Sequence, residues 1–374
     1  MNDTYFFCPN PGCSAHRLDL DDEHWYYRYG FHATRAFGRV QRYRCRRCGK
    51  TFSDQTFLLN YWLKKPTDFA DLGAQINSSS SSLFVARNND YSSDSIRIRQ
   101  DRLGRNGLAL QATLTKQLLI NESLVADGLE SFVSSQFFPI NLNVLIGKRS
   151  KFLYYFTESH SRRKGTTTAK QKHLSTQLYV DKLFQYSTLS IMFTKLLAYL
   201  HNRCPHGTLR LDTDKNPIYR SVISRWNEKA SAAEITLDHR TTPSTAPRTQ
   251  ANDLFAVNYF DRLIRKDLPN HRRETICYAR NDRNMLVRFA YYMVCHNFYK
   301  PFRITSKAKQ RAGTHAERVI VRDEVFKLWS SRMHTHRFFR SLVPLPDYFD
   351  AVWCKRTPTP LKRYADPVPK FAFQ

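Results

Sequence analysis

Runs of apolar residues separated by turn residues predict three successive β-strands in the middle of the chain. These are "NESLVADGLESF" (121–132), "NLNVLIG" (141–147) and "KFLYYFTES" (151–159). The apolar spacing then changes to the helical period, which predicts helices over 169–183 and 188–202. The first half of this region is therefore expected to be three strands followed by helices.

Strands and helices alternate in the next segment. "GTLRLDTDKNPIY" (207–219) begins as a fourth strand, and a helix is expected over 216–227. A short strand, "AEITLDH" (233–239), and an amphipathic helix, "ANDLFAVNYFDRLIRKDL" (251–268), come after it. Three strands followed by helix, strand, helix, strand and helix is the element order of the RNase H-like fold. We therefore predict a mixed sheet flanked by helices.

Acidic residues occupy the positions that this fold uses for catalysis. The first strand is expected to end on Asp127, Asp212 and Asp214 lie at the exit of the fourth, and the last helix carries Asp253, Asp261 and Asp267. Converging carboxylates suit hard divalent cations, and two such ions about 4 Å apart promote phosphodiester cleavage. Each aspartate alone also fits a surface salt bridge or a helix cap, so the prediction depends on the combination.

Four of the eight cysteines form two close pairs near the start of the chain. The motifs "CPNPGC" and "YRCRRCGKTF" place them at the spacing of a structural zinc site, with short aromatic strands between them as in a zinc ribbon. The proposed ligands are Cys8, Cys13, Cys45 and Cys48. His16 is an alternative ligand, and a redox role for the second pair is disfavoured because no βαβ pattern surrounds it. We expect this ribbon to touch DNA through its arginines.

A second small module is predicted in "SSSSSLFVARNNDYSSDSIRIRQDRLGR" (78–105). A short helix, a turn and a longer helix capped by Ser92 or Ser93 have the spacing of a helix–turn–helix. The longer helix would present its basic side chains to the major groove of DNA: Arg97, Arg99 and Arg102. The alternative is an ordinary helical hairpin with a serine linker.

The charge of the chain supports a polyanionic partner. It has 59 Lys and Arg against 32 Asp and Glu, a net charge of +27, and the basic residues are interleaved with aromatics. The loop "SRRKGTTTAKQKH" (161–173) is expected to line a DNA channel, unless it is solvated surface; its candidate contacts are Arg162, Arg163 and Lys164. No apolar stretch long enough for a membrane span, no signal peptide and no P-loop motif is present, so we expect a soluble intracellular protein that uses no ATP.

The ribbon, the helix–turn–helix and the acids in "VADGLESF", "TDKNPIY" and "VNYFDRLIRK" together resemble a DDE/D transposase of bacterial insertion sequences. The resemblance covers about residues 5–305. It implies two Mg²⁺ ions, cleavage at the ends of the element and joining of the freed 3′-hydroxyls to target DNA. Carried across, the catalytic acids are Asp127, Asp214 and Asp261. The third acid of this superfamily is commonly Glu, so Glu274 is a rival for Asp261, as Asp212 is for Asp214.

These predictions divide the chain into four segments. They are a zinc ribbon (1–56), a helix–turn–helix domain (57–117), an RNase H-like catalytic domain (118–305) and a basic helix with a proline-rich tail typical of disorder (306–374). The expected partner is double-stranded DNA at the element ends and in the target, bound by an oligomer of the chain in the prokaryotic nucleoid. The alternatives are a catalytically inactive DNA-binding protein or repressor, and a nuclease that never joins strands.

Overall fold

The computed structural model describes most of the chain. The described residues are 7–18, 22, 24–135, 138–161, 166–178, 188–201, 203–204, 207–229, 235–272, 275, 277–303, 313–359 and 368–374. They form a mixed α/β protein with two separate sheets, one of three strands and one of five.

The smaller sheet lies near the N-terminus, where the sequence predicts a ribbon. Its antiparallel strands are β1 (Tyr26–Thr34), β2 (Gly38–Cys45) and β3 (Thr51–Ser53). A small core of aromatic side chains, including Trp25, Phe52 and Phe57, packs behind the strands together with Phe339 from the C-terminal region. The short aromatic strands predicted between the cysteine pairs are therefore present.

Three helices follow the ribbon: α1 (Phe69–Ile76), α2 (Ser82–Asn88) and α3 (Ser93–Leu114). The Ser92 hydroxyl caps α3 by accepting a hydrogen bond of 3.2 Å from the Ser95 amide. The helix continues well beyond the predicted segment and packs along α8 (Asp282–Val294). A Cβ atom at Gly104 would lie 2.1 Å from the Val287 carbonyl oxygen, so this close approach of the two helices requires glycine.

The larger sheet contains the five strands that the pattern predicts. They are β4 (Leu124–Phe132), β5 (Pro139–Gly147), β6 (Leu153–His160), β7 (Thr208–Asp214) and β8 (Thr236–Thr242), in the order β6-β5-β4-β7-β8. Strands β4 to β6 are antiparallel, and β7 is parallel to both β4 and β8. One detail corrects the sequence analysis: Asp127 lies within β4 and not at its end, because pairing with β5 continues to Phe132.

Helices cover both faces of this sheet. On β6, the Thr157 hydroxyl donates to the Met192 carbonyl, while the next side chain along, Phe156, packs against Phe289 of α8 at a ring distance of 4.9 Å. Since neighbouring strand residues point to opposite faces, α5 and α8 lie on opposite sides of the sheet. The helices that follow the strands are α4 (Ala169–Leu178), α5 (Thr188–Ala198), α6 (Pro217–Lys229) and α7 (Phe255–Asp267).

The C-terminal region is more ordered than its composition predicts. Its helices are α9 (Glu324–Arg332) and α10 (Asp347–Trp353). The Trp353 indole donates to the Ala372 carbonyl at 2.6 Å, and the Arg340 amide donates to the Gln374 carbonyl at 2.8 Å, so the end of the chain is packed against the protein. Residues 360–367 of the predicted tail lie outside the described residues. Short 3₁₀ or π turns occur at η1 (Asp54–Phe57), η3 (Pro269–His271), η4 (Cys295–Tyr299), η5 (Ala316–Arg318), η6 (Arg340–Leu342) and η7 (Lys370–Phe373).

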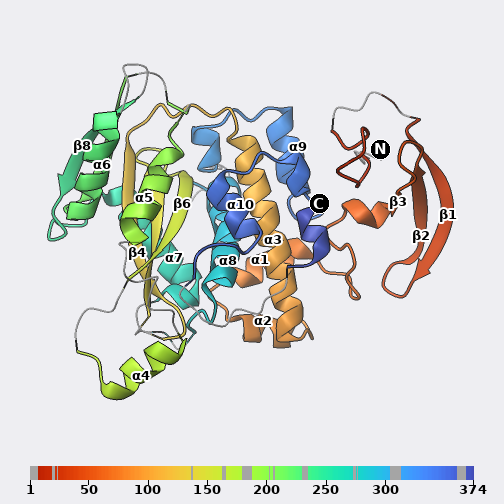
Figure 1. Ribbon diagram of the computed structural model, residues 1–374, viewed down its shortest axis with the longest axis horizontal. Coiled ribbons are helices and arrows are strands. Elements are labelled where there is room, and N and C mark those ends of the chain that lie inside the picture. Colours follow the sequence, from red (N-terminus) through yellow and green to blue (C-terminus); the bar gives the residue numbers. More distant parts are fainter. Residues whose placement is uncertain are drawn as a thin grey trace.

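One hydrophobic core joins most of these elements. It extends from Leu59 to Cys354 and includes side chains of α1 to α3, the five-stranded sheet, α7 to α10 and the segments between them. The predicted segments 57–117, 118–305 and 306–374 therefore share a core, whereas the ribbon has its own. Figure 1 shows the two sheets at opposite ends of the molecule, with α3, α8 and α10 between them.

Candidate active site and four-cysteine cluster

The four paired cysteines come together at one point of the ribbon. The sulfur atoms of Cys8 and Cys48 are 3.4 Å apart, those of Cys13 and Cys45 are 3.8 Å apart, and all four lie within 4.8 Å of one another. Zn–S bonds of about 2.3 Å in a tetrahedron give sulfur separations of this size. The cluster is therefore compatible with zinc binding.

Local turns hold the sulfurs in place. After the second pair, Gly49 has a φ of +71° and its amide donates to the Cys45 carbonyl at 3.0 Å, a turn that favours glycine. His16 is not part of the cluster. Its Nδ1 donates to the Cys8 carbonyl at 2.6 Å and its Nε2 lies 2.7 Å from the Ser341 hydroxyl, so both ring nitrogens are already engaged.

Three aspartates predicted to be catalytic meet on the side of the large sheet that α7 covers. Val125 pairs with Asp212 across β4 and β7, so two residues further along the strands Asp127 lies beside Asp214. Asp261 comes from the middle of α7, which packs on β4. A cavity of about 510 Å³ opens at this point, lined by Asp127, Gly128, Glu130, Arg248, Phe255, Asn258, Tyr259, Asp261, Arg262 and Arg265.

Burial and neighbouring negative charges shift the pKa values of the two aspartates that line this cavity. Burial and the negative charge of Asp214 raise the pKa of Asp127 to about 7. Burial and the charge of Asp127 raise the pKa of Asp261 to about 8, against the opposing effect of Arg265 and Arg248. One carboxylate oxygen of Asp261, Oδ1, is buried with no hydrogen-bond partner among the described residues. Repelling, incompletely bonded carboxylates are a set of oxygen ligands that could hold a divalent cation.

The carboxylates do not form a cage for a single ion. Among the described residues, the groups whose ligand atoms all lie within 4.8 Å of one another are the four cysteines and the set Glu158, His160 and Asp282. That second set is buried between β6 and α8, where the His160 Nε2 is 3.1 Å from an Asp282 oxygen. The three aspartates are not such a group, although Asp127 is coupled electrostatically to both Asp214 and Asp261.

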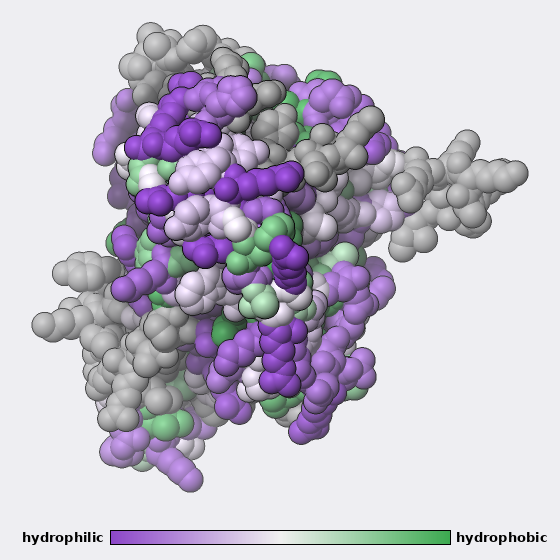
Figure 2. All heavy atoms as spheres, turned by 90° about the vertical axis from the view of Figure 1, so that its right-hand side faces the viewer, coloured by the Kyte–Doolittle hydropathy of each residue, from purple (hydrophilic) through white to green (hydrophobic). Residues whose placement is uncertain are grey.

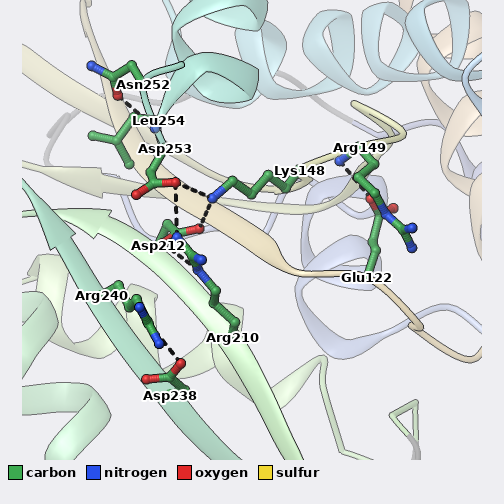
Figure 3. Close-up of polar contacts among 10 residues, drawn as sticks. All are labelled: Glu122, Lys148, Arg149, Arg210, Asp212, Asp238, Arg240, Asn252, Asp253 and Leu254. Atoms are coloured by element: carbon green, nitrogen blue, oxygen red, sulfur yellow. Dashed lines mark hydrogen bonds and ion pairs between the residues drawn. The ribbon is translucent and has the colours of Figure 1, made fainter. Parts of the chain in front are cut away.

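Asp212, the rival of Asp214, is bonded differently. Its side chain is fully buried and accepts from Lys148 at 2.8 Å and from Arg210 at 2.9 Å, and both cations also contact Asp253 (Figure 3). Because two cations neutralise Asp212, it has little capacity to bind a metal ion. Glu274, the rival of Asp261, lies outside the described residues.

The arginines predicted to read DNA have different surroundings. Arg97 keeps a side-chain exposure of 31% and lies 3.6 Å from Asp94. Arg99 and Arg102 are only 4% and 6% exposed, because they turn inward and donate to carbonyl oxygens of the segment that precedes α1. This corrects their assignment to a surface that faces DNA. The other candidates, Arg162, Arg163 and Lys164, lie outside the described residues.

Several residues of the cavity were not selected from the sequence. Arg262 and Arg265 follow Asp261 on the same helix. Basic residues directly after a candidate catalytic acid could have indicated that they belong to the same site. Tyr219, in "TDKNPIY", lies near all three aspartates, and burial and their charges hold its pKa well above the ordinary value. Arg248 reaches the cavity from an irregular loop, and no local pattern in the sequence marks it.

Comparison of the chain with known protein families gives no match, and comparison with curated proteins gives none either. The transposase resemblance therefore remains a hypothesis that depends on the residues themselves. None of the helices in the described ranges is long and apolar enough to cross a membrane.

The raised pKa values predict that Asp261→Asn stabilises the metal-free protein at alkaline pH. The folded-state pKa of Asp261, about 8, exceeds the unfolded value, so the folded chain binds more protons and the free energy of unfolding falls as pH rises through this interval. Asparagine carries no charge, so it avoids the free-energy cost of burying an ionised carboxylate at this position. In thermal denaturation without divalent metal we expect a Tm increase of about 2–4 °C at pH 8.5 and almost none at pH 4.

Asp238→Asn is the matched control for this experiment. Asp238 lies on the same sheet and is 40% exposed beside Arg240, so its replacement should change Tm little at either pH. A lower Tm for Asp261→Asn at pH 8.5 would mean that the ionised carboxylate stabilises the fold, which would contradict the electrostatics described above.

Proposed function

We propose that the chain is a transposase of the DDE/D type, which cuts DNA strands at the ends of an insertion sequence and joins them to target DNA. The observation that carries the proposal is that Asp127 and Asp261 line one cavity and that Asp214 lies close enough to Asp127 for its charge to raise the pKa of Asp127. The three aspartates come from elements that are far apart in sequence; the charge of Asp214 raises the pKa of Asp127, and the charge of Asp127 raises the pKa of Asp261.

The arrangement of the large sheet supports an RNase H-like fold. Three antiparallel strands precede two parallel strands that are connected through helices. The fold places its acids on the first strand, at the exit of the fourth and on a later helix, and these positions correspond to β4, β7 and α7. The same element order on an unrelated protein would have no reason to bring these three acids together.

The three aspartates would be the ligands of Mg²⁺ at this cavity. Two such ions would supply activation of the attacking hydroxyl and neutralisation of charge on the phosphate. The arginines beside them, Arg248, Arg262 and Arg265, give the same cavity positive charge that suits a DNA phosphate. Water would attack phosphorus and break the P–O3′ bond, which leaves a 5′-phosphate and a 3′-hydroxyl. That 3′-hydroxyl would then attack a target phosphorus and release the 3′-hydroxyl of the target strand.

The DNA-binding role is assigned to the N-terminal part of the chain. A zinc-bound ribbon and a helix–turn–helix formed by α2 and α3 would recognise the element ends, with Arg97 as the remaining candidate for a base contact. The net charge of +27 favours this partner. Assembly of several copies on two DNA ends, in the cytoplasm at the nucleoid, completes the proposal.

Strand cleavage by the purified chain tests the proposal. Duplexes that carry the inverted repeats flanking the gene are incubated with Mg²⁺, Mn²⁺ or Ca²⁺, and products are separated on denaturing gels. We expect cleavage and joining with Mg²⁺ or Mn²⁺ and none with Ca²⁺, whose looser coordination positions the reactants poorly. Binding without cleavage in any metal would favour the inactive alternative, and cleavage without joining would favour a nuclease.

A further inference from the structure

A second cavity lies on the ribbon side of the molecule and shares no residue with the carboxylate cavity. Its volume is about 930 Å³, and it separates the β1–β2 hairpin from the loop that follows the ribbon. Its lining comes from residues 32, 34–37, 42, 51–53, 55–56 and 61–65. We call it the ribbon groove. Figure 2 views the side of the molecule that carries the ribbon, where hydrophilic side chains predominate with apolar side chains between them.

The groove is cationic. Its lining includes Arg35, Arg42, Lys64 and Lys65, together with His32, and no Asp or Glu is among the residues that form it. Lys65 is paired with Asp90 at 3.1 Å, whereas Arg35 and Lys64 have no acidic partner in the described ranges. A concave surface with several cations and no carboxylate attracts a polyanion.

Trp62 is the unusual side chain of the groove. It is 77% exposed, the largest such fraction for an aromatic residue in the described part of the chain. Its φ is +59°, a left-handed conformation that a bulky side chain rarely adopts. Such strain persists only where the surroundings impose it, and it is commonest at binding sites.

Hydrogen bonds from neighbouring residues hold the loop that carries Trp62 in this left-handed conformation. The Asn60 side chain closes the loop by two hydrogen bonds to Thr67, of 3.0 and 2.9 Å. From α3, Arg102 donates to the Leu59 carbonyl at 2.6 Å and Arg99 donates to the Thr67 hydroxyl at 2.7 Å. These buried arginines therefore anchor both ends of the loop that carries Trp62 and Lys64, and the loop presents Trp62 to solvent.

We propose that the ribbon groove binds unpaired DNA, with one base stacked on Trp62 and the adjoining phosphates beside Arg35 and Lys64. An exposed indole is a stacking surface for any base, and lysine and arginine beside it follow the sugar–phosphate backbone. In a paired duplex the faces of the bases are covered by their neighbours, so the indole selects strands with free bases. This site goes beyond the cleavage reaction, because it does not depend on the carboxylates.

The test compares two DNAs of equal charge. One is a duplex of about 20 base pairs with a single-stranded tail of about six nucleotides, and the other is a longer blunt duplex with the same number of phosphates. Binding of the full chain is measured by fluorescence anisotropy with no divalent metal added, so no strand is cut. Wild-type protein should bind the tailed DNA more tightly. Trp62→Ala should lower that affinity roughly tenfold and leave the blunt duplex almost unaffected.

Two further variants separate stacking from a general effect. Trp62→Phe keeps an aromatic face and should retain most of the preference for the tailed DNA. Val321→Ala removes another side chain that is 81% exposed and should change neither affinity. Because Trp62 is exposed, its replacement should leave zinc content and thermal stability unchanged.

Three results would overturn the proposal. They are equal binding of the two DNAs by wild type, equal losses on both DNAs for Trp62→Ala, and displacement of the tailed DNA by a poly-glutamate peptide as effectively as by a single strand of equal charge. The last result would indicate an acidic protein as the partner. A chain that never cleaves DNA but shows the Trp62-dependent preference would refute the proposed function and leave this inference intact.

Discussion

Asp127→Asn is expected to abolish strand cleavage, by roughly 10³-fold or more, while binding of the element ends stays close to that of the wild type. Under the proposed function, this substitution would remove a negative ligand that is coupled electrostatically to both Asp214 and Asp261. The cation loses part of its site, and the attacking hydroxyl and the charged phosphate lose its stabilisation. Asp214→Asn and Asp261→Asn should behave in the same way.

Cleavage and end binding are measured on the same protein preparations, with Asp238→Asn as the matched control outside the cavity. Asp212→Asn serves as a second comparison. Because Asp212 is buried and neutralised by Lys148 and Arg210, its replacement should lower thermal stability rather than act on cleavage alone. If Asp127→Asn cleaved DNA as fully as the wild type, the carboxylates would have no catalytic role. If Glu274→Gln lost cleavage and Asp261→Asn did not, the third metal ligand would be Glu274 in place of Asp261, and the rest of the mechanism would stand.

The second large effect concerns the ribbon. Wild-type protein should contain about one zinc ion per chain, and Cys45→Ser should lose it. The side chain of Cys45 is 1% exposed inside the small ribbon core, so the remaining thiols cannot rearrange without opening that core. Since metal binding and folding of such a small unit are coupled, the ribbon should unfold while the main core persists.

Metal analysis and limited proteolysis measure this effect. In Cys45→Ser, cleavage by protease should concentrate before residue 57, and the rest of the chain should resist because its hydrophobic core is separate. Cys204→Ser is the control, since Cys204 lies outside the cluster and should leave the zinc content unchanged. A wild-type protein free of zinc whose ribbon resists protease would rule out a structural metal.

Much of the fold could be predicted from the sequence because its signals are local. Apolar runs between turn residues marked all five strands of the large sheet, and a serine followed by a periodic segment marked the start of α3 at Ser92. The cysteine spacing predicted a cluster, and the four sulfurs do meet. These features depend on residues that are close in the chain.

Other predictions failed or remained open because they depended on distant contacts. The arginines of α3 looked like a DNA-binding face, yet Arg99 and Arg102 are buried against the loop before α1. The proline-rich tail that follows the predicted C-terminal helix had the composition of disorder, but the last residues of the chain bond to Trp353 and Arg340. The residues next to an arginine in the sequence do not reveal whether its side chain is exposed to solvent or donates to a carbonyl group of a distant segment.

The sequence by itself determined the five strands of the large sheet, the cysteine pairs and the candidate acids, since each follows from the order of neighbouring residues. Only the tertiary structure distinguished Asp214 from Asp212. The charge of Asp214 raises the pKa of Asp127, whereas Asp212 is neutralised by two cations. The tertiary structure also brought Arg248 to the cavity and left Trp62 exposed above a cationic groove. The physical reason is that burial and electrostatic coupling are set by which surfaces pack together, and residues far apart in the chain make those surfaces.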